Sequence, residues 1–201
     1  VETLGCTQII CTDKTGTLTQ NQMSVSEIVI GGRTINVSGS GYGPTGDLSE
    51  VGNRVDLATE PVLTQLLMAA ALCNDARVEK HEDESSWHVL GDPTEGALVT
   101  VAAKAGLHQN HLKQTYPRLN ELPFDMTRKR MTTVHALADK KITAFVKGSP
   151  ESTLAVSTSY LSDDGIRPLD SEMLTYFKLK NQELAHSGKR TLGVAMRHLS
   201  G

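Results

Sequence analysis

Aromatic residues make up only 4% of this 201-residue chain, which has a single tryptophan and three cysteines. Long hydrophobic runs are also missing. The longest apolar stretch, 66–73, falls far short of the roughly 18 consecutive apolar residues that a membrane-spanning helix needs. We therefore expect the chain itself to be soluble.

The few cysteines and the modest charge exclude further classes. Cys6, Cys11 and Cys73 form no C-x-x-C pair and are odd in number, which predicts small buried residues rather than a disulfide framework or a metal site. The net charge of -3 offers no global attraction to nucleic acid. The seven histidines are scattered with no Cys or carboxylate at ligand spacing, so we expect them at the surface.

The hydrophobic pattern predicts an α+β fold, an antiparallel β-sheet flanked by helices. Before this sheet, the apolar pair Ile9-Ile10 predicts one strand of a different type. The expected elements are a hairpin of 23–30 and 34–37, a long loop 38–52, a helix 61–74, a strand 87–90, a helix 93–105, strands 131–138 and 141–147, a helix starting at Pro150, a helix 170–187 and a closing strand 192–196.

One carboxylate follows the apolar pair where a strand would end. Asp13 lies in the run CTDKTGTLT, and Gly16 allows backbone amides to approach phosphate oxygens closely. A carboxylate in that place can attack a phosphoryl group and carry it covalently. The alternative is an aspartate in a surface turn that is capped by threonines.

The letters DKTGTLT resemble the phosphorylation motif of the P-type ATPases, which are ion or lipid pumps. The resemblance implies that Asp13 is the nucleophile, that Lys14 steadies the phosphoryl oxygens, and that Asp13 and Thr15 supply oxygens to Mg2+. Thr15 stands where the related haloacid-dehalogenase-type phosphatases have an acid/base aspartate. Because a hydroxyl cannot act as a base near neutral pH, we expect a longer-lived phosphoenzyme, as in a pump.

Three further segments strengthen the resemblance to P-type ATPases. The run KGSPE, 147–151, is similar to the KGAPE motif of their nucleotide-binding domains, and it implies Lys147 and Gly148 in the nucleotide pocket. The run FDMTRKRM, 124–131, looks like the segment in which an aromatic residue, here Phe124, stacks on adenine. The run GDPTEGAL, 91–98, resembles the segment whose acidic residue, here Glu95, lies near the base.

Each of these residues also has a simpler interpretation. Phe124 is a natural stacking partner for a base, or an ordinary core residue. Lys147 brings a point charge on a long stem to a strand end, or is a surface lysine. Asp92, Pro93 and Glu95 form a capping arrangement in which Glu95 reaches back, and this alone explains both acidic residues.

Basic residues complete the expected nucleotide site. Lys129, with Arg128 and Arg130, belongs to the densest basic cluster of the chain, which either neutralises a triphosphate or solvates a strand edge. Arg190 in GKRTLG looks like the family's phosphate-contacting arginine. Met126 departs from the family, since calcium pumps often have an arginine there. The chain has no His-Pro pair, which points to the calcium/sodium/proton-type branch.

The resemblance divides the chain into 1–22, the start of an α/β phosphorylation domain, and 23–201, a nucleotide-binding domain. We expect a cytoplasmic fragment of an integral membrane pump, with ATP and Mg2+ as cofactors and the remaining phosphorylation, actuator and membrane domains as partners. The intact enzyme would hydrolyse ATP to move a cation, with calcium favoured, and the fragment would bind nucleotide with little or no turnover. The alternatives are a stand-alone aspartyl phosphatase and a non-catalytic nucleotide-binding module.

Overall fold

The structure is a computed structural model that describes residues 22–80, 86–137 and 141–199. Asp13, Lys14 and Thr15 lie outside the described residues, as does the pair Ile9-Ile10. The elements in chain order are β1 (Glu27–Ile30), β2 (Arg33–Val37), β3 (Leu48–Glu50), β4 (Asn53–Arg54), the short 3-10 helix η2 (Leu57–Thr59), α1 (Pro61–Leu72), β5 (Arg77–Lys80), β6 (Trp87–Leu90), α2 (Pro93–Lys104), α3 (Gln109–Thr115), β7 (Arg118–Asp125), β8 (Arg130–Ala136), β9 (Ile142–Gly148), α4 (Pro150–Leu154), β10 (Ser159–Ser162), β11 (Gly165–Pro168), α5 (Ser171–His186) and β12 (Gly193–Leu199).

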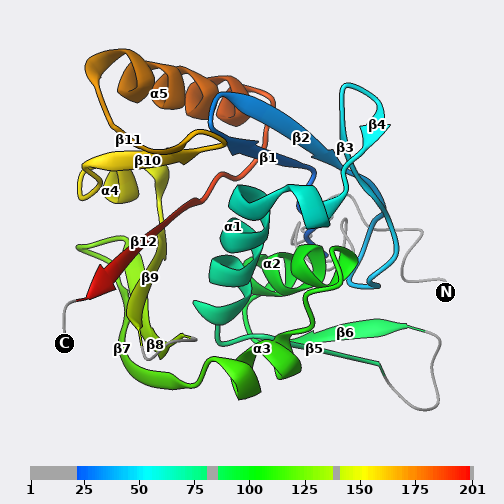
Figure 1. Ribbon diagram of the computed structural model, residues 1–201. Helices are drawn as coiled ribbons and strands as arrows, with labels where there is room; N and C mark the ends of the chain where they lie inside the picture. Colours follow the sequence, from blue (N-terminus) through cyan, green and yellow to red (C-terminus); the bar gives the residue numbers. More distant parts are fainter. Residues whose placement is uncertain (1–21, 81–85, 138–140, 200–201) are drawn as a thin grey trace, which may run out of the picture.

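Two four-stranded antiparallel sheets enclose the central helices. One sheet has the strand order β1-β2-β3-β4 and the other β12-β9-β8-β7, while β5-β6 and β10-β11 form separate hairpins. Figure 1 shows α1 and α2 in the middle of the molecule, with one sheet on each side. This arrangement confirms the predicted α+β fold of antiparallel sheets flanked by helices.

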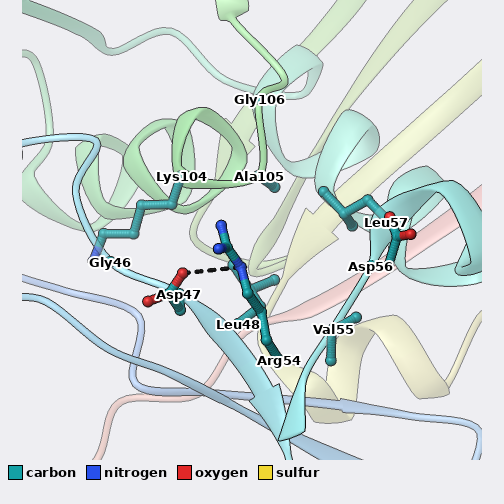
Figure 2. Close-up of a pocket in the computed structure, with 10 residues that line it drawn as sticks. All are labelled: Gly46, Asp47, Leu48, Arg54, Val55, Asp56, Leu57, Lys104, Ala105 and Gly106. Atoms are coloured by element: carbon teal, nitrogen blue, oxygen red, sulfur yellow. Dashed lines mark ion pairs between the residues drawn. The ribbon is translucent and has the colours of Figure 1, made fainter.

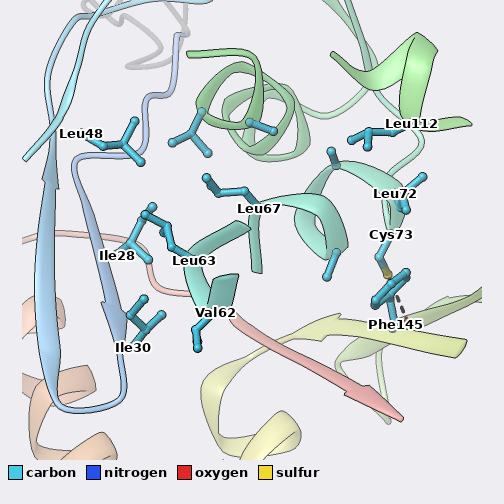
Figure 3. Close-up of a cluster of buried hydrophobic side chains, with 14 of the residues drawn as sticks. Ile28, Ile30, Leu48, Val62, Leu63, Leu67, Leu72, Cys73, Leu112 and Phe145 are labelled. Carbon is cyan, nitrogen blue, oxygen red and sulfur yellow. Dashed lines mark hydrogen bonds between the residues drawn. The ribbon is translucent and has the colours of Figure 1, made fainter. Parts of the chain in front are cut away.

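The core lies around α1, which contacts both sheets. Val62 and Leu63 on its first turn lie toward Ile28 and Ile30 of β1, as Figure 3 shows. At the other end, the thiol of Cys73 donates to the carbonyl oxygen of Phe145 on β9 at 3.5 Å. Because this cysteine is fully buried, desolvation raises the pKa of its thiol, which confirms the expected role of a small buried residue.

Short-range signals account for the ends of the predicted elements. The β1-β2 hairpin turns at Gly31 and Gly32, whose φ angles of 53° and 88° suit a tight turn of the type that pairs well with twisted strands. Helix α2 starts behind the N-cap Asp92, and α5 starts behind Asp170, whose side chain accepts from the amide of Met173 at 2.8 Å. Such caps are each worth about 1 kcal/mol of helix stability.

The predicted loop 38–52 was only partly correct. Strand β3 lies inside it, and Leu48 on this strand is buried in the core cluster. The glycine-rich composition around it concealed three residues whose pairing is set by β2, with Val37 opposite Leu48. Strands β5, β7, β10 and β11 and helix α3 were also not predicted, since none of them has a clean alternating or helical apolar pattern.

The expectation that all histidines lie at the surface was wrong for His135. This side chain on β8 is only 1% exposed. Its Nδ1 lies 2.9 Å from the carbonyl oxygen of Tyr116, and its Nε2 lies 3.0 Å from the hydroxyl of Thr133. Both ring nitrogens therefore have partners, which makes burial of the ring tolerable.

Arg33 joins three parts of the molecule at one guanidinium. Its Nη2 lies 2.8 Å from carboxylate oxygens of Glu50 on β3 and of Glu60, the residue before α1. Its Nη1 lies 2.6 Å from Asp163 in the turn between β10 and β11. Hydrogen bonds to these carboxylates raise the pKa of the Arg33 guanidinium further above its usual range.

Within the described ranges 22–80, 86–137 and 141–199, no helix has the length and hydropathy to cross a membrane.

Candidate nucleotide site

A bulge in the edge strand β7 places Phe124 opposite the central strand β8 of the second sheet. The β7-β8 register breaks between Leu122 and Asp125, so Pro123 and Phe124 both stand opposite Met131. A two-against-one mismatch of this kind bends a strand and re-aims its side chains. The Phe124 side chain is 57% exposed, so the interpretation as an ordinary core residue is wrong.

Met131 connects this bulge to the predicted lysine. Met131 on β8 pairs with Lys147 on β9, and Lys147 pairs in turn with Val194 on β12. Phe124 therefore lies in the same cross-strand row as Lys147, two strands and about 10 Å away.

Lys147 is buried and paired. It shares the core-facing side of β9 with Phe145 and Thr143, and its side chain is only 7% exposed. Its Nζ lies 2.6 Å from Oε1 of Glu95, which belongs to the first turn of α2. The interpretation as a surface lysine is therefore wrong, because the charge lies inside the molecule and is compensated by one carboxylate.

Glu95 does not take part in a capping box. Its Oε2 accepts from the backbone amides of Asp75 and Ala76, each at 3.1 Å, on the segment that follows α1. The N-cap of α2 is Asp92 alone, whose Oδ1 accepts from the amides of Thr94 and Glu95 at 2.8 and 3.2 Å. Burial opposes ionisation of Asp92, yet these hydrogen bonds outweigh it and hold the pKa of that carboxyl below its usual value.

Gly148 lies against the turn that carries Lys129. A Cβ on Gly148 would stand 2.4 Å from the carbonyl oxygen of Lys129 and 2.4 Å from Cβ of Arg130. The Lys129 backbone is in the left-handed region with φ of 52°, and its carbonyl accepts from the amide of Ser149 at 2.9 Å. Only a glycine allows β9 to approach this turn so closely, which places Lys129 at the end of the strand that carries Lys147.

Arg190 lies at the same end of the sheet. It is exposed and precedes Gly193, which pairs with Gly148. Its positive charge contributes to the lowered pKa of Asp92, the N-cap of α2, although less than the hydrogen bonds do. The structure therefore brings together Glu95, Phe124, Lys129, Lys147, Gly148 and Arg190 around one end of the second sheet, with Glu95 and Lys147 in direct contact.

Sequence reasoning missed one member of this site. The sequence pattern places Asn74 only as the last residue of the predicted helix 61–74, but its side chain is fully buried and donates to the backbone carbonyl of Glu95 at 3.0 Å. The available signal was an amide side chain placed directly after the apolar run that ends at Cys73.

The phosphorylation motif cannot be placed in this geometry, since Asp13, Lys14 and Thr15 lie outside the described residues. The magnesium site that rests on Asp13 and Thr15 therefore stays a prediction. Within the described part of the chain, no group of three or more His, Cys, Asp and Glu side chains is arranged to hold a metal ion.

One hollow of the described surface lies away from the residues predicted for the nucleotide. A cavity of about 540 Å³ opens between the β3-β4 hairpin and the C-terminal end of α2, and the ion pair of Arg54 and Asp47, 3.1 Å apart, lies at it (Figure 2). Its lining carries charges of both signs and includes none of the residues predicted for the nucleotide. It is lined by Gly46, Asp47, Leu48, Arg54, Val55, Asp56, Leu57, Lys104, Ala105 and Gly106.

Comparison with known proteins agrees with the motifs. Residues 62–201 match the family model for the P-type ATPase, cytoplasmic domain N. The chain is 38% identical over 198 residues, 98% of its length, to a calcium-transporting ATPase of Bacillus subtilis, and covers 22% of that protein. It is 46% identical over 170 residues, 82% of its length, to the cation-transporting ATPase pma1 of Synechocystis, and covers 18% of it.

A mammalian protein is similar over the same region. The chain is 35% identical over 199 residues, 97% of its length, to the calcium-transporting ATPase type 2C member 1 of Bos taurus, of which it covers 20%. The chain thus spans about a fifth of the length of these relatives.

Proposed function

Because this chain belongs to the P-type ATPase family, with residues 62–201 matching cytoplasmic domain N, we propose that it binds ATP for a cation-transporting pump. The observation that supports this most directly is the row across the second sheet. An exposed Phe124 lies in the same cross-strand row as the buried Lys147, two strands away, and Lys147 contacts the carboxylate of Glu95 from another element. An apolar face next to a few convergent polar groups is typical of a small-molecule site.

The base is the part of ATP for which the pocket is most complete. Adenine stacks on the open face of Phe124, which is worth about 1–3 kcal/mol. A carboxylate has about four acceptor positions. Glu95 already uses three of them, for Lys147 and the amides of Asp75 and Ala76. One acceptor position remains, and it suits the exocyclic amino group of adenine.

The phosphates lie toward the basic end of the sheet. The close approach of Gly148 to the Lys129 turn brings that turn to this end, where Lys129 and Arg190 are both exposed. Their charges offset those of a triphosphate, and the guanidinium of Arg190 can engage two oxygens at once. Met126, 79% exposed, offers no such contact, so binding strength comes mainly from the adenosine end.

In the intact pump, residues 1–22 begin the phosphorylation domain and Asp13 is the nucleophile. A carboxylate oxygen of Asp13 forms a bond to the γ-phosphorus, and the bond to the β,γ-bridging oxygen breaks to release ADP. Lys14 steadies the phosphoryl oxygens. Mg2+, when bound, offsets phosphate charge, and the carboxylate of Asp13 and the carbonyl of Thr15 are oxygen donors of the kind that Mg2+ prefers.

The partners of the chain in this proposal are the rest of the phosphorylation domain, the actuator domain and the membrane domain of the same pump. Aspartyl phosphorylation switches the membrane sites between their two facings. Calcium is the proposed ion, since the relatives from Bacillus subtilis and Bos taurus are named calcium-transporting ATPases. The chain alone is expected to bind nucleotide with little or no turnover.

An amide NMR titration with ATP and with AMP tests the proposal. We expect shifts at Phe124, Lys147 and Glu95 that are similar for both nucleotides, because the base supplies most of the contacts. Phe124→Ala should weaken ATP binding by about 5- to 150-fold, the equivalent of 1–3 kcal/mol.

Leu122→Ala is the matched control. Leu122 is as exposed as Phe124, 57% in both cases, and lies on the same strand just before the bulge, so its removal should leave ATP binding unchanged. Shifts confined to Asp13 and its turn would instead favour a stand-alone phosphatase. No shift at all would defeat the proposed nucleotide site.

A further inference from the structure

Asn74 is a buried amide whose hydrogen bonds reach the nucleotide site from behind. It lies two residues after the end of α1 and is 0% exposed. Its Nδ2 donates to the carbonyls of Ala70 at 3.2 Å and Glu95 at 3.0 Å, and its Oδ1 accepts from the amide of Ala76 at 2.9 Å. One side chain thus links the last turn of α1, the segment after it, and the first turn of α2.

Asn74 supports both residues of the hydrogen bond between the Ala76 amide and the Glu95 carboxylate. The amide of Ala76, which Asn74 fixes, donates to Oε2 of Glu95 at 3.1 Å. The backbone carbonyl of Glu95 is held by the same Asn74 side chain. Asn74 therefore supports both Ala76, which donates this hydrogen bond, and Glu95, which accepts it. The other carboxylate oxygen of Glu95, Oε1, contacts Lys147.

We propose that Asn74 is a positioning residue that sets the preference of this site for a 6-amino purine over a 6-oxo purine. The proposal rests on the proposed ATP site. A carboxylate oxygen held in one place accepts from the amino group of adenine, whereas the 6-oxo group of hypoxanthine brings a second acceptor against it and is repelled. Without the Asn74 side chain, the Glu95 carboxylate keeps Lys147 and the amides of Asp75 and Ala76 as partners, but it is positioned less firmly, and the two bases become more alike to the site.

Other side chains also hold the backbone around Asn74, so the effect of Asn74 on the site can be distinguished from an effect on the fold. Gln109, 7% exposed, donates from Nε2 to the carbonyls of Ala71 and Ala76 at 3.3 and 3.0 Å. Arg118 donates from Nη2 to the carbonyls of Leu72 and Asn74 at 3.1 and 2.8 Å. The segment therefore keeps its path when the Asn74 side chain is shortened, while the direct hydrogen bond to Glu95 is lost.

The test is the ratio of the affinities for ATP and inosine triphosphate, measured by calorimetry on the full chain. Wild type should prefer ATP, and Asn74→Ala should lower the ratio about two- to tenfold, the usual range for losing one neutral hydrogen bond. In a Glu95→Ala background, Asn74→Ala should change the ratio no further. If Asn74→Ala does not fold, Asn74→Asp serves instead, since it keeps the acceptor for Ala76 and turns an oxygen toward the Glu95 carbonyl.

Gln109→Ala is the matched control, because it removes a buried amide of α3 that supports the same segment and does not touch Glu95. It should lower stability and leave the ratio unchanged. Equal losses of ATP and inosine triphosphate affinity in Asn74→Ala, an equal fall of the ratio in Gln109→Ala, or no preference in wild type would each overturn the positioning role. Failure of wild type to bind ATP would instead overturn the proposed function itself.

Discussion

Lys147 on β9 and Glu95 on α2 meet at 2.6 Å between Nζ and Oε1, with side chains only 7% and 17% exposed. The pair joins the helical layer to the second sheet across 52 positions of sequence. Desolvating two charges is costly, and their mutual attraction offsets this cost only while both are present. The pair is thus both a part of the proposed site and a structural contact.

Removing one partner of this pair should destabilise the fold strongly. Lys147→Met leaves Glu95 with an uncompensated buried charge, and we expect a loss of about 3–5 kcal/mol in the free energy of unfolding. The double variant Lys147→Met with Glu95→Gln should recover much of that loss, because no buried charge remains. Urea unfolding of the three proteins measures both effects, and a single variant as stable as wild type would contradict this account.

Gly148→Ala should distort the approach of β9 to the Lys129 turn. The added Cβ would stand 2.4 Å from the Lys129 carbonyl oxygen, which is backbone and cannot move aside cheaply. We expect a loss of about 1–3 kcal/mol in thermal or urea unfolding, together with weaker ATP binding. Gly188→Asn is the control, since a Cβ there meets nothing within 4 Å and asparagine tolerates its φ of 76°; that variant should stay close to wild type.

Arg33→Lys should loosen the junction of three elements. The ammonium keeps the charge but cannot span Glu50, Glu60 and Asp163 with the geometry of a guanidinium. We expect a loss of about 1–3 kcal/mol in urea unfolding. Arg54→Lys is the control, because Arg54 is 81% exposed in its pair with Asp47 and such surface pairs contribute little. Equal effects of the two substitutions would contradict the role given to Arg33.

Features with local causes could be predicted from the sequence. The Gly31-Gly32 turn and the Asp92-Pro93 and Asp170 helix starts depend on neighbours a few residues apart, and all were confirmed. The nucleotide segments were found by resemblance to a known family, and their convergence at one end of a sheet required the strand order β12-β9-β8-β7.

Features that depend on distant partners could not be predicted. The bulge at Phe124 follows from the register that β8 imposes on β7, which no local pattern of an edge strand containing Pro123 reveals. The acceptor role of Glu95 toward Ala76 joins residues 19 apart, and the local capping pattern favoured a different contact. The polar residue His135 likewise gave no sign of burial, because its partners Tyr116 and Thr133 become visible only in three dimensions.

The burial of His135 should make stability depend on pH. Desolvation lowers the pKa of this imidazole below its usual 6.5, and the nearby charges of Arg118 and Lys113 act in the same direction, against the hydrogen bond with the carbonyl of Tyr116. The unfolded chain therefore binds a proton at a higher pH than the folded chain. The stabilisation is complete above the unfolded pKa and is lost as the pH falls through 6.5 toward the folded value.

His135→Gln should flatten this dependence. One proton taken up on unfolding changes the free energy of unfolding by at most about 1.4 kcal/mol per pH unit, and the variant should lack this slope below pH 6.5. Urea unfolding at a series of pH values between 5 and 8 measures it, with His111→Gln on the exposed face of α3 as the control that should keep the wild-type slope. Parallel curves for wild type and His135→Gln would mean that the buried imidazole is protonated as easily in the fold as in the unfolded chain. In that case the hydrogen bond to Tyr116, which favours the charged ring, would outweigh the cost of desolvation.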